Sequence, residues 1–530
     1  MHLDFIPFRN TNYFSNLICD YLDENEKLKQ FYHRFPDIHN FKDQIEEKEL
    51  NYPVDHREIL VRKLKIQYAN LSSSEATLQN IHLLSQENTF TITTGHQLNL
   101  FTGPLYFLYK IISTINLCKE LNEKYSEFNF VPVYWMATED HDFEEINYFN
   151  VNGKKIHWNR PAKGAVGELN TAGLKEVFNL LSLELGGSKN AKYLENLFNE
   201  AYLKNESLAD ATRFLANELF KGYGLVIIDA NDTDLKRLFV PFIKEELLNN
   251  TSYNQVTKTN KELYKHSNIQ VTPREINLFY LKENLRERIT KENKSYLVNN
   301  TDIKFSEKEI LTELNNHPER FSPNVIMRPL YQEVILPNLC YIGGAGELAY
   351  WFQLKKYFNE VNVTFPILLL RDSLLIQTQK QSKKLKKLNI TTQDLFLKRD
   401  AFINKKVREI SNVDIDFTPQ KEHLQEQFKQ LYELAKQTDK SFLGAVKAQE
   451  RKQIKGLEHL EKRLLKAQKR KLADQVSRMT EIQNQLFPNQ SLQERNTNFS
   501  ELYLQYGELL IKQLIENINP LEMNFKVLTL

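Results

Sequence analysis

The sequence of 530 residues is poor in glycine and proline, with 16 of each. These two residues normally make up roughly 12% of a globular chain, about twice their share here. Because both disfavour helix interiors, their scarcity predicts long helices. Hydrophobic residues make up 41% and charged residues 26%, which is ordinary for a globular protein. The length predicts roughly two to four structural units.

Cysteine is also scarce, and Cys19, Cys118 and Cys340 lie far apart in the sequence. This excludes a disulfide framework and a zinc site of paired thiolates, and it indicates reduced thiols. The N-terminal stretch lacks the basic start and apolar run of a signal peptide. No apolar run reaches the roughly 18 residues of a membrane helix. We therefore expect a cytoplasmic protein without a membrane partner.

The net charge of +2 gives no overall field that would attract nucleic acid. The basic run "KAQKRKLADQ" at 466–475 fits either a nucleic-acid contact or a solvated helix face. Acidic residues interleaved with the basic ones favour the solvated face. We expect no nucleic-acid partner.

Short β-rich runs occur at 90–94, 128–137, 223–230 and 363–372, separated by helical segments. Nearly continuous apolar strands that alternate with helices predict an α/β fold with a parallel sheet covered on both faces. We assign an N-terminal helical segment (1–88), a core (89–150 and 321–373), an inserted connecting region (151–320) with a further core strand near 223–230, a coiled coil (374–490) and a C-terminal segment (491–530). No strand is expected after Ser373.

The coiled-coil prediction depends on an apolar series from Ile454 to Leu486 that advances mostly in steps of three or four. This spacing places one apolar stripe along a long helix. Its partner is either the segment from Leu424 to Leu434, in an antiparallel hairpin, or a second subunit. Because that segment is shorter than the stripe, we expect a homodimer joined through the coiled coil.

The first candidate site is "TITTGHQLNLFTGPLYFLYK", residues 91–110, where a strand is followed by a loop and a helix from about Pro104. Gly95 and Gly103 would let the backbone approach an anion, and the helix start offers free N–H groups. The glycine spacing matches neither the P-loop nor the dinucleotide fingerprint. The alternative is a structural turn before a capped helix.

The second candidate site is "VPVYWMATEDHDFEEINYF", residues 131–149, where carboxylates surround His141 at a strand end. Such a group suits a metal, an amine or acid–base chemistry, since buried unpaired carboxylates would be costly. An acidic helix start is the alternative, and we favour it for Glu144 and Glu145.

The third candidate site lies in residues 328–358, where Gly343, Gly344 and Gly346 lead into a helix with Glu347 in its first turn. A polar set that includes Arg328 precedes it. A glycine trio of this kind fits either close backbone contact with a ligand or a simple helix-entry turn.

The three segments "TGHQLNLFTGPLYFLYK", "PVYWMATEDHDFEEIN" and "RPLYQEVILPNLCYIGGAGELAYW", in this order, resemble the cysteine ligase family of bacillithiol biosynthesis, known as BshC. The resemblance covers essentially the whole chain. It implies a Rossmann-like, nucleotidyltransferase-type core with connecting inserts and a dimerising coiled coil. It also implies an enzyme that joins cysteine to glucosaminyl malate, with ATP activating the cysteine carboxylate through an acyl-adenylate. His96 would occupy a place comparable to the signature histidine of such cores.

The candidate catalytic residues are His96, Gln97, Asp140 and His141. The candidate nucleotide- or substrate-binding residues are Thr94, Gly95, Asn99, Thr102, Gly103, Lys110, Trp135, Glu139, Arg328, Tyr331, Gln332, Gly343, Gly344, Glu347 and Arg371. Backbone N–H groups near Gly95 and Gly103 would stabilise phosphoryl charge, and Asp140 or His141 would accept the amine proton or hold the cysteine ammonium.

Two features of related enzymes are absent. There is no cysteine pair to hold a zinc ion, so no metal ligand is assigned and zinc or magnesium stays open. There is no Lys-Met-Ser-Lys-Ser loop, so Arg328, Lys110 or Arg371 would have to bind phosphates. Two alternatives stay open: a metal-dependent hydrolase or deacetylase using Asp140, His141 and Asp142, and a non-catalytic nucleotide-binding scaffold.

Overall fold

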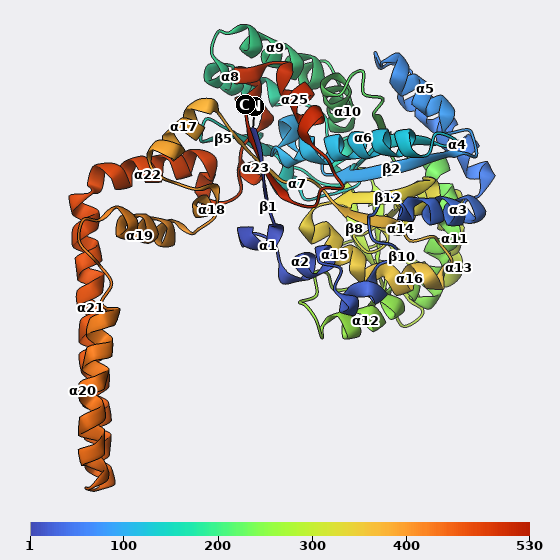
Figure 1. Cartoon of the computed structure of the whole chain (residues 1–530). Helices are drawn as coiled ribbons and strands as arrows, with labels where there is room; N and C mark the ends of the chain where they lie inside the picture. Colours follow the sequence, from blue (N-terminus) through green and yellow to red (C-terminus); the bar gives the residue numbers. More distant parts are fainter. Residues whose placement is uncertain (1) are drawn as a thin grey trace. The chain divides into compact units, whose positions relative to one another are not determined.

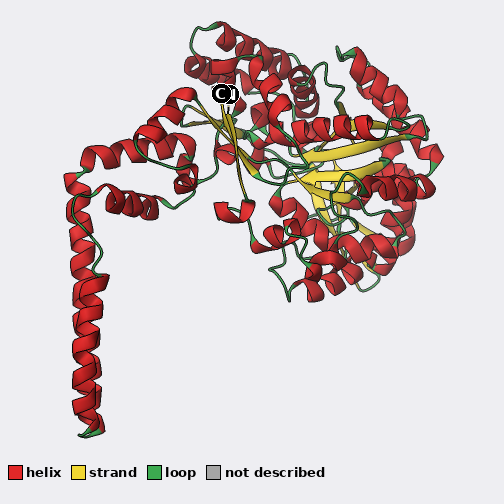
Figure 2. Ribbon diagram, in the orientation of Figure 1, coloured by secondary structure: helices red, strands yellow, loops and turns green. Residues whose placement is uncertain are grey.

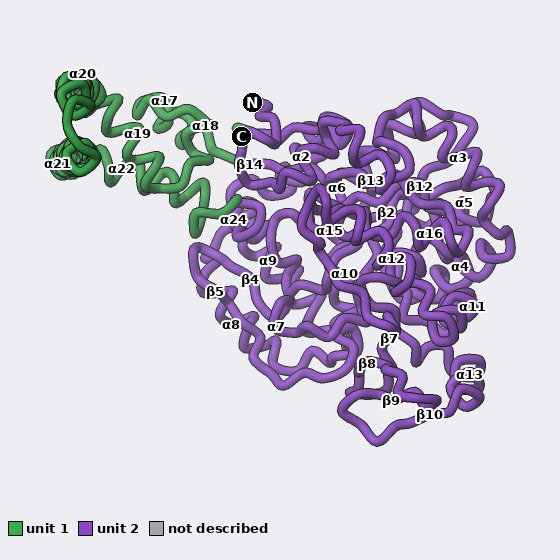
Figure 3. The backbone as a smooth tube through the Cα atoms, turned by 90° about the horizontal axis from the view of Figure 1, so that it is seen from below, with its two compact units in different colours: residues 1–2, 376–492, 529–530 green, residues 3–375, 493–528 purple. Residues whose placement is uncertain are grey.

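The computed structural model describes residues 2–530, which form two compact units (Figure 3). The core unit contains residues 3–375 and 493–528. The coiled-coil unit contains residues 376–492, with the extreme ends of the chain. The C-terminal segment that we separated from the core at 491 therefore belongs largely to the core unit.

The core unit is built on a five-stranded parallel sheet, yellow in Figure 2. The strand order is β13 (Ile367–Leu370), β12 (Asn338–Gly343), β2 (Thr89–His96), β3 (Asn129–Met136) and β6 (Val226–Asp229). Almost every residue in these strands is buried, which explains their nearly continuous apolar sequences. The predicted α/β fold with a parallel sheet is confirmed.

One strand of this sheet was missed in the sequence. The four β-rich runs contain β2, β3, β6 and β13, but β12 was not predicted. It begins three residues after helix α14 (Arg328–Ile335) ends, and its last residue belongs to the glycine cluster. A short strand so close to a helix gives no separate periodic signal.

The two faces of the sheet are covered by different helices (Figure 1). Phe90 and Ile92 of β2 pack in one apolar cluster with Leu117 and Leu121 of α6 (Tyr106–Lys124). The alternate residues of β2 point to the other face, where the hydroxyls of Thr91 and Thr93 donate to Asn338 Oδ1.

The N-terminal segment adds one strand and several helices to the core unit. They are β1 (His2–Ile6), α1 (Phe8–Thr11), α2 (Asn16–Leu22), α3 (Asn40–Asn51), α4 (Val54–Gln67) and α5 (Glu75–Leu83). Arg57 of α4 donates to the carbonyls of Leu84, Glu87 and Thr89. These bonds fix α4 to the chain that enters β2.

The inserted region contains a second sheet that the sequence did not predict. It is antiparallel, in the order β10 (Lys304–Ser306), β9 (Ser295–Val298), β8 (Leu285–Glu292), β7 (Leu278–Lys282) and β11 (Phe321–Pro323). Its longest strand, β8, is rich in Lys, Arg and Glu, and the others are short, so composition suggested helix or loop. β6, by contrast, joins the parallel sheet as expected.

The other elements between β3 and β13 are mostly helices. They are α7 (Phe143–Ile146), β4 (Tyr148–Val151), β5 (Lys154–His157), α8 (Leu174–Leu185), α9 (Lys189–Phe198), α10 (Leu208–Leu219), α11 (Thr233–Asn249), α12 (Thr251–Leu263), α13 (Glu307–Asn316), α15 (Ala345–Trp351) and α16 (Lys355–Glu360).

The coiled-coil unit contains an antiparallel helical hairpin of α20 (Thr418–Lys436) and α21 (Lys440–Lys471). Lys421 pairs with Glu461, and Tyr432 donates to Glu450, so the partners run backwards along α21. The hairpin alternative is therefore confirmed. The predicted stripe from Ile454 to Leu486 is not one helix, because the chain leaves helical geometry at Leu472.

The stripe continues in α22 (Ala473–Leu486), whose buried residues pack within the unit against α19 (Arg399–Ile410). The remaining helices of this unit are α17 (Gln379–Lys387) and α18 (Thr392–Leu395). Beyond the hairpin, the chain forms α23 (Gln493–Asn496), α24 (Phe499–Tyr506), α25 (Leu509–Asn517) and β15 (Phe525–Thr529).

Strands do occur after Ser373, which corrects the sequence interpretation. β14 (Leu374–Gln377) and β15 form a three-stranded sheet with β1. β14 is too short for a periodic signal, and the other two strands of its sheet come from the two ends of the chain. No helix within residues 2–530 combines the length and the apolar character needed to span a membrane.

Candidate functional site

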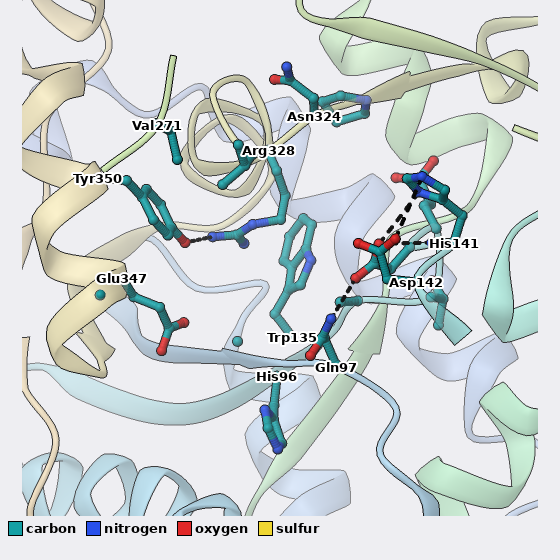
Figure 4. Close-up of a pocket in the computed structure, with 18 of the residues that line it drawn as sticks. His96, Gln97, Trp135, His141, Asp142, Val271, Asn324, Arg328, Glu347 and Tyr350 are labelled. Carbon is teal, nitrogen blue, oxygen red and sulfur yellow. Dashed lines mark hydrogen bonds and ion pairs between the residues drawn. The ribbon is translucent and has the colours of Figure 1, made fainter. Parts of the chain in front are cut away.

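A cavity of about 880 Å³ lies at the carboxyl ends of the parallel strands (Figure 4). This is where ligands collect in open α/β sheets, because loops leave the sheet there. The loops after β2, β3, β6 and β12 supply one part of its wall, and the antiparallel sheet of the inserted region supplies another. All the residues that line it belong to the core unit.

The structure brings most of the predicted site residues together in this cavity. Those that line it are Gly95, His96, Gln97, Lys110, Trp135, Glu139, Asp140, His141, Arg328, Gly344, Glu347 and Arg371. The first and second candidate sites of the sequence thus line one cavity.

The other predicted residues lie outside the cavity wall and bond or pack within the fold. They are Thr94, Asn99, Thr102, Gly103, Tyr331, Gln332 and Gly343. Thr94 donates to Ile342 O and ties β2 to β12, and Tyr331 donates to Ala230 O. Gln332 accepts a hydrogen bond from Arg328, so it orients a cavity residue from outside.

Gly95 and Gly103 have different roles. β2 extends to His96, so Gly95 lies in the strand and not in the predicted loop, whereas Gly103 follows the strand. A Cβ at Gly95 would lie 3.2 Å from the Tyr341 hydroxyl and 3.7 Å from an Arg328 guanidinium nitrogen. Gly95 therefore keeps space for these cavity side chains. Gly103 has φ +62°, and its carbonyl accepts a hydrogen bond from Asn498. It serves a structural turn, so the predicted ligand role for Gly103 is replaced by the turn alternative.

The helix start at the glycine cluster is already capped by the protein. Gly344 N–H donates to Glu347 Oε2 at 2.8 Å, and Tyr341 donates to Glu347 Oε1 at 2.6 Å. Lys110 pairs with the same carboxylate and donates to Gly95 O. Burial alone would raise the pKa of Glu347, but Lys110 and these donors outweigh it and lower the pKa. The Gly344 N–H is therefore already paired within the protein, as in the helix-entry turn that was one of the two interpretations of this glycine cluster.

His96 is a buried, neutral imidazole at the end of β2. Its ring packs against Tyr106 and Phe107 of α6 at centroid distances of 5.4 and 5.2 Å. Burial lowers its pKa well below the usual range, and Lys110 and Arg371 lower it further. Its Nε2 has no hydrogen-bond partner within residues 2–530. A buried polar atom without a partner is costly, so a hydrogen bond to Nε2 would be favourable.

Arg328 gives the cavity a positive charge that no carboxylate neutralises. Its guanidinium donates to Gln332 Oε1 at 3.2 Å and Tyr350 OH at 3.4 Å, and it faces the rings of Trp135 and Tyr341. Within the described part of the chain, no carboxylate lies at ion-pair distance from it. Figure 4 shows Arg328 with Tyr350 and Trp135 on the same side of the cavity as Glu347.

The acidic group lies on the other side of Gln97 (Figure 4). Gln97 Nε2 donates to Asp140 Oδ2 and to Glu145 Oε2, both at 2.9 Å. Arg286 of β8 donates to His141 Nδ1, and the ring of Phe279 lies 5.4 Å from that of His141. The imidazole is thus held with Nδ1 as acceptor.

A metal ion fits this group poorly. Ligand atoms of Asp140, His141 and Asp142 lie within 4.8 Å of one another. However, the Asp140 carboxylate accepts hydrogen bonds from Gln97 and from the backbone N–H of His141. The Arg286 guanidinium donates to the ring nitrogen Nδ1 of His141. A cation would have to displace these donors beside a fixed positive charge. This observation also weighs against the alternative of a metal-dependent hydrolase or deacetylase.

Glu139 and Trp135 support the wall between these two sides. Glu139 forms a close ion pair with Lys236, whose side chain is fully buried. Burial raises the pKa of Glu139 and lowers that of Lys236, because it disfavours both charges. Trp135 packs edge-on against Tyr331 at 5.5 Å. The predicted ligand role of Glu139 thus competes with a structural pair.

Sequence reasoning missed several arginines of the cavity. Arg274, Arg286 and Arg288 come from the inserted region, and Arg495 comes from beyond the coiled coil. Arg286 and Arg288 alternate along β8 and both face the Phe279 ring, at 4.0 and 5.9 Å. This period of two was the one available signal, and it required recognising 285–292 as a strand.

Two family models match the chain. The first, "Bacillithiol biosynthesis BshC, N-terminal Rossmann-like domain", matches residues 1–372. The second, "Bacillithiol biosynthesis BshC, C-terminal coiled-coil domain", matches residues 374–530. Together they account for nearly the whole sequence.

Curated relatives match over similar lengths. A protein of Flavobacterium johnsoniae named "Putative cysteine ligase BshC" is 61% identical over 530 residues, which is 100% of both chains. Proteins with the same name from Cytophaga hutchinsonii and Staphylococcus saprophyticus are 38% and 30% identical. The alignments cover 98% and 92% of each chain, respectively. With its parallel sheet, its helical hairpin and matches along its full length, the chain belongs to the BshC family of bacillithiol biosynthesis.

Proposed function

We propose that this chain is a cysteine ligase that joins the carboxylate of cysteine to the amine of glucosaminyl malate and so forms bacillithiol. The observation that carries the proposal is the arginine-rich cavity, above all Arg328, whose charge no carboxylate neutralises. The proposed substrates are anionic: cysteine carries one carboxylate, glucosaminyl malate carries two, and ATP carries phosphates. Guanidinium groups bind carboxylates and phosphates in a planar, directional way.

The opposite side of the cavity suits an amine. Asp140 is half-buried, and Gln97 and the His141 N–H hold its carboxylate in place. A fixed carboxylate can hold an ammonium group, or accept the proton that an amine loses when it attacks an acyl carbon. In this reaction the C–N bond forms at the cysteine acyl carbon, the C–O bond to the activating adenylate would break and release AMP with that oxygen, and the amine proton would pass to Asp140.

ATP would supply the activation that amide formation from a carboxylate needs. The residues that would hold its phosphates are Arg328 and Arg371, with His96 Nε2 as a neutral partner. Lys110, which was an equal candidate in the sequence, uses its ammonium for Glu347 and Gly95 O, whereas Arg371 keeps an unpartnered Nε–H beside its pair with Glu494. The buried, unpartnered Nε2 of His96 is the feature of this chain that fits an added oxygen ligand.

The proposed assembly is a homodimer through the coiled-coil unit. Leu431, Leu434 and Leu460 of the hairpin expose 41, 52 and 53% of their surface. Exposed leucines on both helices of one hairpin favour a partner surface, and a two-fold dimer is the simplest closed arrangement. We also place the protein in the cytoplasm, which its three buried cysteines without disulfides support.

The reaction can be tested with the purified chain. Cysteine, glucosaminyl malate and ATP are mixed with the protein, and bacillithiol is measured by mass spectrometry. We expect product that requires all three compounds and that falls by about 100-fold in Arg328→Ala, since a charged contact in a shielded site is lost. Product formed equally well without ATP would contradict the nucleotide dependence. Product absent even with added cell extract would contradict the ligase function.

A further inference from the structure

The chain leaves the core unit after Leu375 and returns to it at Gln493. The first residues after this return, Glu494 and Arg495, lie in α23 at the wall of the cavity. The coiled-coil family model includes both residues. In the structure, however, they belong with the Rossmann-like residues that form the site.

Glu494 is fully buried, and its carboxylate binds the segment that follows β13. Oε1 accepts from Arg371 at 2.8 Å and from Ser373 Oγ at 3.2 Å, and Oε2 accepts from Leu374 N–H at 3.1 Å. Both oxygens are therefore used to hold the chain at the carboxyl end of an edge strand. Such a buried carboxylate fixes one arrangement of its cationic partner.

Arg371 is held on almost every side. One terminal nitrogen donates to Asp372 O and Ser373 Oγ, the other donates to Glu494, and the guanidinium lies 5.0 Å from the Tyr106 ring centre. Burial alone would lower the pKa of Arg371, but Glu494 outweighs this and raises it. Arg371 is 4% exposed and lines the cavity.

One donor of Arg371 is left over. Its Nε has no hydrogen-bond partner within residues 2–530, and it lies 3.8 Å from the position that a Cβ on Gly344 would take. Gly344 also lines the cavity. A buried N–H donor without a partner, beside a glycine of the cavity wall, points to a ligand oxygen.

Arg495 adds a second positive charge at the same place. It is exposed, lines the cavity, and has no carboxylate at ion-pair distance among the residues that the structure describes. Arg371 and Arg495 both act on Tyr106: burial raises the pKa of this phenol, and the two cations partly oppose the rise. Arg371, Arg495 and Tyr106 all line this one cavity, and the Arg371 guanidinium lies 5.0 Å from the Tyr106 ring centre.

We propose that Arg371 Nε and Arg495 together bind an oxyanion of a substrate, and that Glu494 is the positioning residue that holds Arg371 for this contact. The oxyanion is a phosphate of the nucleotide or a carboxylate of the malyl group. This identification rests on the proposed function, whereas the oxyanion site itself rests on the structure. The segment that follows the coiled coil therefore completes the site of the core unit.

The Arg495 part is tested by binding, without turnover. Affinities of the full-length protein for inorganic pyrophosphate and for L-malate are measured by calorimetry at low salt. We expect Arg495→Ala to weaken the affinity for one of the two probes by about 10-fold. Arg495→Lys should weaken it less, since lysine keeps the positive charge but lacks the planar guanidinium that donates two hydrogen bonds at once. Arg62→Ala, which removes an exposed arginine paired with Asp234 outside the cavity, is the matched control and should bind like wild type.

The two probes distinguish the two sources of the oxyanion. Loss of pyrophosphate binding assigns a nucleotide phosphate, and loss of malate binding assigns the substrate carboxylate. If wild type binds neither probe, or if Arg495→Ala binds both as wild type does, the proposal is wrong. Probe binding that depends on Arg495 in a protein that makes no bacillithiol would contradict the proposed function and leave this inference standing.

The Glu494 part needs a readout that a purely structural role would not move. Glu494→Gln keeps the shape of the side chain but removes the charge that orients Arg371. We expect the probe whose binding depends on Arg495 to bind about 10-fold more weakly per folded molecule. In the reaction, the KM for the substrate that carries this oxyanion should rise by a larger factor than kcat falls. In a double-mutant cycle with Arg371→Lys, the losses of probe-binding free energy in the two single variants should not add in the double variant, because both act through the contact of Arg371 with the probe. Additive losses, or unchanged affinity in the folded fraction, would overturn the positioning role.

Discussion

Lys110 of α6 and Glu347 of α15 form an ion pair in the cavity wall, with 2.5 Å between Nζ and Oε2. Lys110 is 4% exposed and Glu347 is 26% exposed. Lys110 also donates to the carbonyl of Gly95, and Glu347 also accepts from the Gly344 N–H. This single pair therefore joins the end of β2 to the loop after β12.

The first prediction concerns the stability of this pair. Glu347→Gln leaves the ammonium of Lys110 buried without a counter-charge, which should cost about 3 kcal/mol of unfolding free energy. The double variant Lys110→Met/Glu347→Gln removes both charges and should recover most of that loss. Urea midpoints of the three proteins provide the measurement. A single variant as stable as the double variant would show that the charge of Lys110 is compensated elsewhere.

The second prediction concerns Gly95. In Gly95→Ala, the added Cβ would lie 3.2 Å from the Tyr341 hydroxyl, so Tyr341 and its neighbour Arg328 must shift. We expect kcat/KM to fall by about 10-fold or more, with a small change in stability. A small displacement of a residue that positions the substrate lowers the reaction rate much more than it lowers the free energy of unfolding. Gly187→Ala is the matched control, since its Cβ would meet no atom within 4 Å. Equal activity of the two variants would mean that Gly95 does not set this geometry.

The third prediction concerns a lysine outside the site. Burial lowers the pKa of Lys355 to about 8, although Glu47 partly opposes this. Between pH 8 and the ordinary lysine pKa near 10.5, the unfolded chain binds more protons than the folded chain, so stability rises with pH. Below pH 8 the penalty is complete, because both states are then protonated.

Lys355→Met removes this penalty and should stabilise the protein at pH 7 by about 1–2 kcal/mol, a value discounted for partial solvent contact. The gain should shrink toward pH 10. Unfolding free energies at both pH values test this. Lys356→Met, at the neighbouring residue paired with Glu262, is the control and should give no gain. A destabilised Lys355→Met at pH 7 would contradict the shifted pKa.

The sequence predicted those parts of the fold that carry a local signal. β3, β6 and β13 were visible because their residues are mostly apolar, and β2 was visible because it is rich in the β-branched residues Thr and Ile. β8 was not visible, because its charged residues resemble those of a surface helix. It becomes a strand through pairing with β7 and β9, and this depends on residues outside the segment.

The candidate site divides in the same way. Arg328 and Asp140 lie within recognisable sequence motifs, and both line the cavity. Local sequence could not show that Glu347 caps its own helix and neutralises Lys110 from a distant segment. Nor could it show that Glu494 accepts a hydrogen bond from Arg371, because the whole coiled-coil unit separates the two residues in the sequence. Long-range pairs of this kind need the tertiary fold.

The fourth prediction concerns the proposed dimer. Replacing Leu431, Leu434 and Leu460 with Glu places charges on the exposed leucines of the hairpin, where burial against a partner would be strongly unfavourable. Light scattering should show the 62.6 kDa monomer in place of a dimer. A triple Glu variant of Leu50, Leu180 and Leu183, which are exposed in the core unit, should remain dimeric. A dimer that survives the hairpin substitutions would place the interface elsewhere.

The central claim, that the chain makes bacillithiol through this cavity, is tested most directly by thiol profiling of the organism that encodes it. The gene is deleted, and the strain is complemented with wild type, Arg328→Ala or the control Arg62→Ala. We predict no bacillithiol and accumulated glucosaminyl malate in the deletion and Arg328→Ala strains, with bacillithiol restored by wild type and by the control. Normal bacillithiol in the deletion strain would contradict the function, and normal bacillithiol with Arg328→Ala would contradict the site.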